Sequence, residues 1–359
     1  MAITKTEQLT RRLRNEIASG HFRPGTLFPS ITELEEQFGM KRTVVQLAVK
    51  ELRQDGFVES DGGKRMKVSD TPPHLSQYGI VFAATRSSPE RPRFDEAVCK
   101  EATKIEQQGQ HRFRFYEGAT DPDEGAAVTA RLRADIEARR LGGLLLFPGT
   151  HECLGNYDSK LLCGVPHVFV CGFEPNQEWQ PQINIDMDAF IDRALADLAA
   201  KGRKRVCLVY MAGTLNGIDP SPFERHGLTF RRAWMQAVGR SHPEVARGLV
   251  HILLDYPAAQ RPDAMIIADD NLVEATAAGL VETGLRVGKD IDVVAHCNWP
   301  WPIPSILPVR RLGFHAGTLL QEAGVVLDAL RHKRPAPAVT LIAPVFEEEA
   351  RTPTPIASR

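Results

Sequence analysis

The sequence predicts a small α+β domain at the N-terminus followed by a larger α/β domain of two lobes. Three observations support this division. Apolar residues recur at helical spacing in the first 56 residues, and a short hairpin pattern follows them. A stiff stretch with two adjacent prolines at 71–78 is typical of a linker. Beyond it, short apolar runs alternate with helical stretches as far as residue 346, which indicates α/β architecture.

The first predicted helix has an apolar residue at every fourth position. Leu9, Leu13 and Ile17 therefore lie on one face, and Gly20 is suited to end the helix. Because this face is narrow and the other positions are polar, we expect one side of the helix to be buried in the domain core.

Two more short helices and a hairpin complete the predicted N-terminal domain, 1–70. Ser30 can cap the second helix, since Glu33 follows at the spacing of a capping box. Gly39 separates the second helix from a third that ends at Gly56. The apolar face of the third helix consists of Val45, Ala48, Val49 and Leu52. Two helices joined by a tight turn predict a helix-turn-helix, and FVES-DGGKR-MKV predicts two short strands.

The region 79–346 contains runs typical of buried strands. These runs are YGIVFAA, FRFYEG, GGLLLF, VPHVFVCG, RVCLVYM, GLVHILL, AMIIAD and IDVVAH. The helical stretches between them are 94–109, 123–139, 187–200, 223–239 and 271–283. This alternation predicts parallel, doubly wound sheets, and the number of repeats predicts two lobes. The Pro/Thr/Glu-rich segment 347–359 is expected to be a flexible tail.

Composition excludes several classes of protein. Hydrophobic residues make up 43% and charged residues 25%, which is typical of globular chains. No run of about 18 apolar residues is present, and the first twenty residues lack the apolar core of a secretory signal. We therefore expect a cytoplasmic protein with no membrane partner and with reduced cysteines. Residues 1–70 carry a net charge of +2 and the remainder −3, which weakly favours an anion-binding N-terminus.

Polar and basic residues at the start of the third helix are typical of a helix that reads the major groove of DNA. They are Lys41, Arg42, Thr43 and Gln46. The tip of the hairpin adds Lys64, Arg65 and Lys67, which suit phosphates or the minor groove. The alternative is a solvated charged face on a small helical domain. The order helix, helix, basic-tipped hairpin favours DNA binding.

Residues 9–68 resemble the GntR-type winged-helix DNA-binding domain. The resemblance rests on IASG (17–20), RPGTLFPS (23–30) and KRTVVQLAVKELRQDGFVE (41–59). It implies that Arg42 is the arginine of the recognition helix and that Ser30 belongs to the DNA-binding set. Thr32, Lys41 and Arg65 stand where the family often has arginine, serine and glycine, which leaves the operator sequence open but not the fold.

The segment RPDAMIIADDNLVEATAAGLVETGLRVGKDIDVVAH (261–296) resembles LacI-type regulators, which share the type I periplasmic sugar-binding-protein fold. KGRKRVCLV, VPHVFV, INIDMDAFIDRALADL and FERHGLTFRRAW fit the same frame, so the resemblance covers about 79–345. It implies a homodimer that binds operator DNA under the control of a small molecule, a sugar or derivative, bound between the lobes.

The LacI-type frame also implies ligand-binding residues. Arg225 takes the place of a cleft arginine that suits vicinal hydroxyls or a carboxylate; its alternative is a surface ion pair. Asp269 takes the place of a cleft asparagine; its alternative is a helix N-cap. Asn298 stands where the family has an aspartate.

Aromatic residues and two further positions complete the expected ligand site. Trp299 and Trp301 suit stacking on a sugar, although they could equally pack at a lobe edge or a dimer contact. Arg86 and Phe94 are candidates by position, and Arg86 could simply be solvated.

The sequence lacks the motifs that an enzymatic function would require. The sequence has no dinucleotide-binding glycine motif after a strand, no nucleophile elbow and no metal-spaced histidine pair. The neighbours His151, Glu152 and Cys153 cannot all face one metal from a strand. We expect no catalytic residues, cofactor or metal. The alternatives are an α/β enzyme acting on a sugar or nucleotide with an N-terminal interaction module, and a constitutive dimeric DNA-binding protein.

Overall fold

A computed structural model describes residues 3–62, 65–109, 111–150, 162, 164–170, 181–215 and 218–351. The chain forms two compact units, each assembled from separate stretches of sequence. The first unit contains Met1–Arg86, Thr103–Phe169 and Val325–Ala336. The second unit contains Ser87–Ala102, Val170–Gly324 and Pro337–Arg359. The N-terminal domain thus belongs to one compact unit with part of the α/β domain.

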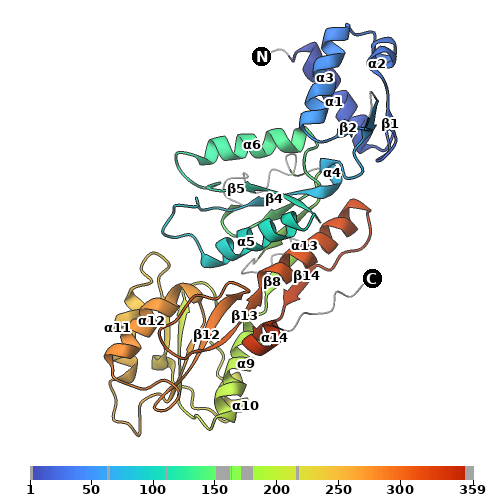
Figure 1. The fold of residues 1–359 in the computed structure, drawn as a ribbon. Helices are drawn as coiled ribbons and strands as arrows, with labels where there is room; N and C mark the ends of the chain where they lie inside the picture. Colours follow the sequence, from blue (N-terminus) through green and yellow to red (C-terminus); the bar gives the residue numbers. More distant parts are fainter. Residues whose placement is uncertain are drawn as a thin grey trace. The chain divides into compact units, whose positions relative to one another are not determined.

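The N-terminal domain has the predicted winged helix-turn-helix fold (Figure 1). Its elements are α1 (Lys5–Ala18), β1 (Leu27–Phe28), α2 (Ile31–Phe38), α3 (Arg42–Gln54), β2 (Val58–Ser60) and β3 (Met66–Val68). The three strands form an antiparallel sheet in the order β1-β3-β2. The predicted helices and hairpin of this region are therefore confirmed.

The winged helix has a closed apolar core of its own. Leu13 of α1, Leu34 of α2 and Leu52 of α3 are fully buried in one cluster with residues of the hairpin. The helix ends follow from local chemistry, since Ser30 caps α2 through the predicted capping box. Gly39 ends α2 in the left-handed conformation, with φ 61°, which glycine adopts without strain.

The remainder of the first unit contains a parallel sheet. Its elements are α4 (Pro73–Ser76), β4 (Gln77–Val81), β5 (Arg112–Tyr116), α6 (Gly125–Glu137), β6 (Gly143–Leu146) and β7 (His167–Val170). The strands lie in the order β7-β6-β4-β5, and every residue of β4 is buried. Figure 1 shows α6 across one face of this sheet.

The predicted linker 71–78 is largely structured. It contains α4 and the first residues of β4, because Pro73 suits the first turn of a helix and Tyr78 is buried in the sheet. The late stretch Val325–Ala336 also packs on this part of the first unit. Arg331 donates hydrogen bonds to the Leu75 carbonyl at 2.9 Å and the Tyr78 hydroxyl at 3.0 Å.

The second unit has a six-stranded sheet in the order β10-β9-β11-β12-β13-β15. These strands are β9 (Val206–Met211), β10 (Met235–Val238), β11 (Ala264–Ile267), β12 (Asp292–Trp299), β13 (Arg310–His315) and β15 (Val345–Phe346). All pair in parallel except β13 with β15. A further parallel pair joins β8 (Gln182–Ile185) to β14 (Val339–Ile342).

The helices that belong wholly to the second unit are α9 (Met187–Ala200), α10 (Ser221–Arg225), η1 (Arg232–Trp234), α11 (Val245–Leu254), η2 (Asp270–Leu272), α12 (Val273–Glu282) and α14 (Glu347–Ala350). Two more helices, α5 (Arg93–Gln107) and α13 (Ala316–Arg331), contribute residues to both units. The α14 helix occupies the start of the predicted flexible tail, and 352–359 lie outside the described residues.

Two predicted elements of the α/β domain are wrong. The stretch 223–239 is not one helix, because Gly227, with φ 65°, follows α10 and Met235–Val238 pairs with β9. GLVHILL belongs to helix α11 rather than to a strand. Its buried residues recur at helical spacing, while Ile252 is 68% exposed, and a short apolar run cannot by itself separate these two structures.

Strands β12 and β13 approach so closely that one position admits only glycine. A Cβ on Gly313 would lie 1.8 Å from the Cys297 carbonyl oxygen. Cys297, Cys207 and Cys99 are buried thiols that form no disulfide among the described residues, and burial raises the pKa of Cys207 and of Cys297. Among the described residues no helix combines the length and apolarity that crossing a membrane requires.

Candidate nucleic-acid interface and ligand-binding residues

The N-terminus of α3 is open to an anionic partner. Lys41 occupies the N-cap position without a side-chain hydrogen bond to the helix, and the first turn contains no acidic residue. By contrast, α1 and α2 begin with capping boxes closed by Glu7 and Glu33. The first N–H groups of α3 and its positive dipole end therefore remain available to a phosphate.

The four residues of α3 that were predicted to read the major groove are all exposed. We call α3 the reading helix below. Lys41, Arg42 and Thr43 follow one another at the start of α3, and Gln46 lies one turn further on. The Arg42 guanidinium is 3.3 Å from Glu35 of α2, yet 60% of its side chain is exposed. The ion pair thus holds Arg42 at the helix start without burying it.

The two predicted residues of α2 have different surroundings. The Ser30 hydroxyl accepts a hydrogen bond from the Glu33 N–H at 3.3 Å, so its observed role is to start the helix. Thr32 is exposed in the first turn. Thr32 can therefore contact DNA without breaking a hydrogen bond to another described residue.

The basic residues of the wing are not equivalent. Arg65 is exposed, whereas the Lys67 ammonium lies 3.0 Å from Glu59 and 2.8 Å from Asp70. The hydrogen bonds that this ammonium donates, the one to Asp70 first and the one to Glu59 second, raise the pKa of Lys67. Lys64 lies outside the described residues. Arg65 is therefore the described wing residue best placed to meet a phosphate.

Sequence reasoning missed Leu47, which is 52% exposed beside Gln46 on α3. An exposed apolar side chain on a reading helix suits the methyl group of a thymine. The signal was present in the sequence, because Leu47 lies between the core positions 45, 48, 49 and 52 and so must face outward.

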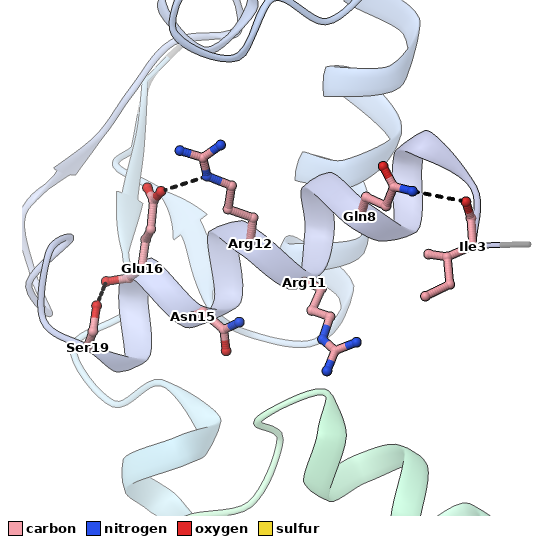
Figure 2. A pocket seen from close by; sticks show the side chains of 7 residues that line it. All are labelled: Ile3, Gln8, Arg11, Arg12, Asn15, Glu16 and Ser19. Atoms are coloured by element: carbon pink, nitrogen blue, oxygen red, sulfur yellow. Dashed lines mark hydrogen bonds and ion pairs between the residues drawn. The ribbon is translucent and has the colours of Figure 1, made fainter.

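A shallow hollow lies along α1. It is lined by Ile3, Gln8, Arg11, Arg12, Asn15, Glu16 and Ser19. Figure 2 shows Arg12 turned toward Glu16, with Arg11 and Asn15 on the other side of the helix. The Arg12 guanidinium also lies 4.6 Å from the centre of the Phe38 ring, so α1 uses this arginine to pack on α2.

Residues at the carboxyl ends of β11 and β12 form a buried polar cluster in the second unit. The Asn298 amide donates to Asp270 at 2.6 Å, and His296 Nδ1 lies 3.9 Å from the same carboxylate. Burial, with a further effect from Asp269, raises the pKa of Asp270 to about 7. Burial lowers the pKa of His296 to about 4. The Asn298 carbonyl oxygen and both His296 ring nitrogens lack hydrogen-bond partners among the described residues.

Two of the predicted ligand-binding residues make the contacts of the alternative roles considered for them, a helix N-cap and a surface ion pair. Asp269 accepts from the Asn271 N–H at 2.9 Å and so caps η2. Arg225 forms a 2.8 Å ion pair with Asp192, which His226 also contacts at 3.0 Å. Because 58% of the Arg225 side chain is exposed, this ion pair leaves the guanidinium accessible.

The aromatic candidates also differ from each other. Trp299 is buried, and its indole N–H donates to the Val345 carbonyl at 3.0 Å, which is packing at a sheet edge. Trp301 is 41% exposed and donates to Glu101 at 3.2 Å, with Lys100 over its ring. Phe94, near the start of α5, is partly buried.

The other positional candidate, Arg86, belongs to the first unit, where it lies 3.6 Å from Glu117. The neighbours His151, Glu152 and Cys153 lie outside the described residues. In the part of the chain that the structure describes, no cluster of His, Cys, Asp and Glu side chains has the arrangement of a metal site.

The described residues thus contain a winged helix with an exposed third helix and, beyond it, an α/β domain with parallel sheets. Residues 5–68 match the family described as bacterial regulatory proteins, gntR family, so the N-terminal domain is a GntR-type helix-turn-helix domain. A 50-residue segment is 46% identical to the uncharacterized HTH-type transcriptional regulator YieP of Escherichia coli K12. The match covers 14% of this chain and 22% of YieP.

Solved structures match the larger part of the chain. A regulatory protein of LacI family from Chloroflexus aggregans is 16% identical, with a TM-score of 0.58 over 75% of this chain and 96% of its own. A LacI family transcriptional regulator from Lactobacillus casei with bound glucose is 14% identical, with a TM-score of 0.53 over 76% and 98%. The predicted two-lobed, periplasmic-binding-protein-like fold is thereby confirmed.

Proposed function

We propose that this protein is a DNA-binding transcription regulator whose affinity for operator DNA is controlled by a small molecule. In this proposal α3 enters the major groove, and Arg65 at the wing meets the phosphate backbone. The α/β domain binds the effector, a sugar or a sugar derivative. Two copies of the chain bind the two halves of a palindromic operator, and no catalytic step is involved.

The observation that carries the DNA-binding proposal is the start of α3. Lys41, Arg42 and Thr43 are exposed at a helix N-terminus that no side chain caps. Gln46 and Leu47 extend the same exposed surface by one turn. Bidentate donors for guanine, an amide for adenine and an apolar side chain for thymine are thus gathered on one helix.

The proposal of a carbohydrate effector is supported by the polar cluster at the ends of β11 and β12. The carboxyl ends of parallel strands are the usual ligand-binding edge of such sheets. A hydroxyl-rich ligand matches Asn298, whose carbonyl oxygen is a buried acceptor without a partner among the described residues. Bound glucose in the Lactobacillus casei structure agrees in ligand class with this assignment.

The first experiment is selection of binding sequences from a random duplex library at near-physiological salt, using the full-length protein. We expect enrichment of one palindromic motif. Arg42→Ala tests whether α3 reads that motif, and Arg286→Ala is its matched control. Both arginines are exposed and paired with one carboxylate, Glu35 or Asp290, but Arg286 lies in the second unit. No enrichment with the wild-type protein would contradict DNA-binding regulation and favour an enzyme with an interaction module.

A second experiment tests the effector. Thermal unfolding of the full-length protein is measured with individual sugars, including glucose and sucrose, and with sugar phosphates. A ligand that binds the native state raises the midpoint of unfolding in a concentration-dependent manner. Any hit is then added to the operator-binding assay, where a changed affinity supports regulation. Operator binding with no response to any of these compounds would favour a constitutive dimeric DNA-binding protein.

A further inference from the structure

Within the first unit, an ion pair links the winged helix to the parallel sheet β7-β6-β4-β5 and its helix α6, which together are called the first lobe below. This ion pair lies at the C-terminal end of α3, the reading helix. Asp55 is the C-cap residue of α3, and its carboxylate lies 3.0 Å from Nε of Arg140, which follows α6 in the lobe. Arg14 of α1 contacts the same carboxylate from inside the winged helix. Asp55 thus connects two helices of the DNA-binding domain to one arginine of the lobe.

Arg140 is itself firmly placed within the lobe. Its guanidinium lies 3.1 Å from the buried carboxylate of Asp135, which also accepts from the Tyr116 hydroxyl at 2.6 Å and from Arg114 at 2.7 Å. Burial alone would raise the pKa of Asp135, but these three donors outweigh burial and lower it. The Arg140 carbonyl also accepts from the Gln77 amide of β4 at 2.9 Å.

Further contacts surround this ion pair. The His74 ring stacks on Phe57 with centres 5.9 Å apart and planes 9° from parallel. Arg112 of β5 donates to the Thr71 carbonyl at 3.2 Å, and Arg139 donates to Asn15 of α1 at 3.5 Å. These contacts hold the winged helix against the lobe, so the 71–78 stretch does not act as a free linker.

The two ends of α3 have different tasks. Lys41 and Arg42 begin the helix, while Asp55 follows its last residue, Gln54. A helix of 13 residues is about 20 Å long, so the residues expected to read DNA and the ion pair with the lobe lie about 20 Å apart. Because α3 shares one apolar core with α1 and α2, the contact at Asp55 fixes the orientation of the reading end together with the rest of the winged helix.

We infer that Arg140 is a positioning residue that, through Asp55, sets the orientation of the reading helix relative to the lobe. This inference rests on the proposed function. It concerns where the reading helix is held and not which bases it contacts. Loss of Arg140 should therefore leave binding to a single half-site unchanged and alter the recognition of two half-sites at a fixed spacing.

The test uses full-length Arg140→Gln, with Arg114→Gln as the matched control. Arg114 also binds Asp135, but the structure records no contact between it and Asp55. Hydrogen–deuterium exchange in peptides covering 55–78 is measured first, without DNA. We expect exchange about tenfold faster in Arg140→Gln than in Arg114→Gln, with unchanged exchange in the core of α1 and α3.

Binding is then measured on duplexes that carry two copies of the selected half-site at different separations. The wild-type protein and Arg114→Gln should favour one spacing, and Arg140→Gln should bind several spacings with similar affinity. Arg140→Lys, which keeps the charge, should be intermediate.

Exchange in Arg140→Gln equal to that in the control would overturn the inference, as would faster exchange with an unchanged spacing preference. If the wild-type protein selects no DNA sequence, the proposed function fails and the inference about DNA fails with it. The exchange experiment would still report separately whether Arg140 holds the two domains together.

Discussion

Glu59 and Lys67 face each other across the two strands of the wing, and the Lys67 ammonium lies 3.0 Å from the Glu59 carboxylate. Asp70 approaches the same ammonium at 2.8 Å. Two carboxylates therefore offset the charge of Lys67 before any DNA is present. Arg65, two residues earlier, is exposed at the end of the hairpin.

The wing should therefore use Arg65 more than Lys67 for phosphate contacts. In Arg65→Ala we expect weaker operator binding and a reduction of about 1 in the slope of log affinity against log salt concentration. In Lys67→Ala the slope should change much less, because the ammonium is paired with Glu59 and Asp70 rather than with a phosphate. Fluorescence anisotropy titrations over a series of salt concentrations measure both slopes. Equal reductions in the two variants would contradict this ranking.

Replacement of Arg42 by alanine should weaken operator binding by about 1–3 kcal/mol, or about 5- to 150-fold, if its guanidinium reads a base. Since 60% of the side chain is exposed, thermal stability should hardly change. Arg286→Ala should leave DNA binding intact. Affinity is measured on the selected operator and on single-base variants of it. Unchanged affinity in Arg42→Ala would place this residue outside the interface.

Ser30 should matter for stability through its hydroxyl group. Ser30→Ala removes the acceptor that caps α2, and we expect a loss of about 0.5–2 kcal/mol in the free energy of unfolding. Ser30→Thr retains a capping hydroxyl and should lose less. Urea denaturation followed by circular dichroism measures the difference. The capping role would be refuted by equal stability of Ser30→Ala and the wild-type protein.

Acid should lower the free energy of unfolding through His74, whose ring stacks on Phe57. Burial, with help from Arg331 and Arg139, lowers the pKa of His74 to about 4, whereas an unfolded histidine titrates near 6.5. Between these values the unfolded chain binds a proton that the folded chain does not, so stability falls as the pH drops from 6.5 toward 4. His74→Phe keeps an aromatic ring on Phe57 and removes this titration.

The wild-type protein must be compared with His74→Phe, because other groups also titrate over this range. The raised pKa of Asp270, for example, makes the folded protein more stable as the pH falls, which is opposite to the effect of His74. The difference between the two proteins isolates the contribution of His74. Relative to His74→Phe, the wild-type protein should lose about 1–2 kcal/mol more between pH 7 and pH 4.5. Urea unfolding at each pH gives this difference. Parallel stability curves for the two proteins would show that His74 does not titrate differently on folding.

Arg225→Ala separates a ligand contact from a surface ion pair. If Arg225 binds the effector, the variant should lose effector binding and keep the operator affinity of the effector-free protein. Asp192→Asn is the control, because it removes the observed ion pair and keeps the guanidinium. Calorimetry with a sugar identified by thermal unfolding measures both. If Arg225→Ala binds the effector with normal affinity, Arg225 is not a ligand contact, and its role is the surface ion pair with Asp192.

The winged helix could be predicted from the sequence because its determinants are local. The spacing of Leu9, Leu13 and Ile17, the capping box at Ser30 and the glycine at 39 each depend on residues within one or two turns. Strands β11 and β12 could likewise be read from apolar runs. GLVHILL could not, because a short run of apolar residues has no period that distinguishes a helix from a strand.

Contacts between distant residues account for what sequence reasoning did not find. Arg140 and Asp55 are 85 positions apart, and Asp192 and Arg225 are 33 apart. No local pattern pairs these residues, since each contact exists only after the chain has folded back on itself. Lys67 was predicted to contact phosphates or the minor groove, and its ion pairs with Glu59 and Asp70 were not expected. Here a local clue existed, because an antiparallel hairpin places Glu59 directly opposite it.

The three-part composition of the first unit has a consequence for how the protein is made. The winged helix has its own core and can form once its 70 or so residues have left the ribosome. The lobe beside it also needs Val325–Ala336, where Arg331 bonds to Leu75 and Tyr78. At about 5–20 residues per second, this last stretch is translated about eight to thirty seconds after Phe169. During that interval the nascent chain carries a finished DNA-binding domain on an unfinished lobe, an exposed stage that a chaperone would be expected to protect.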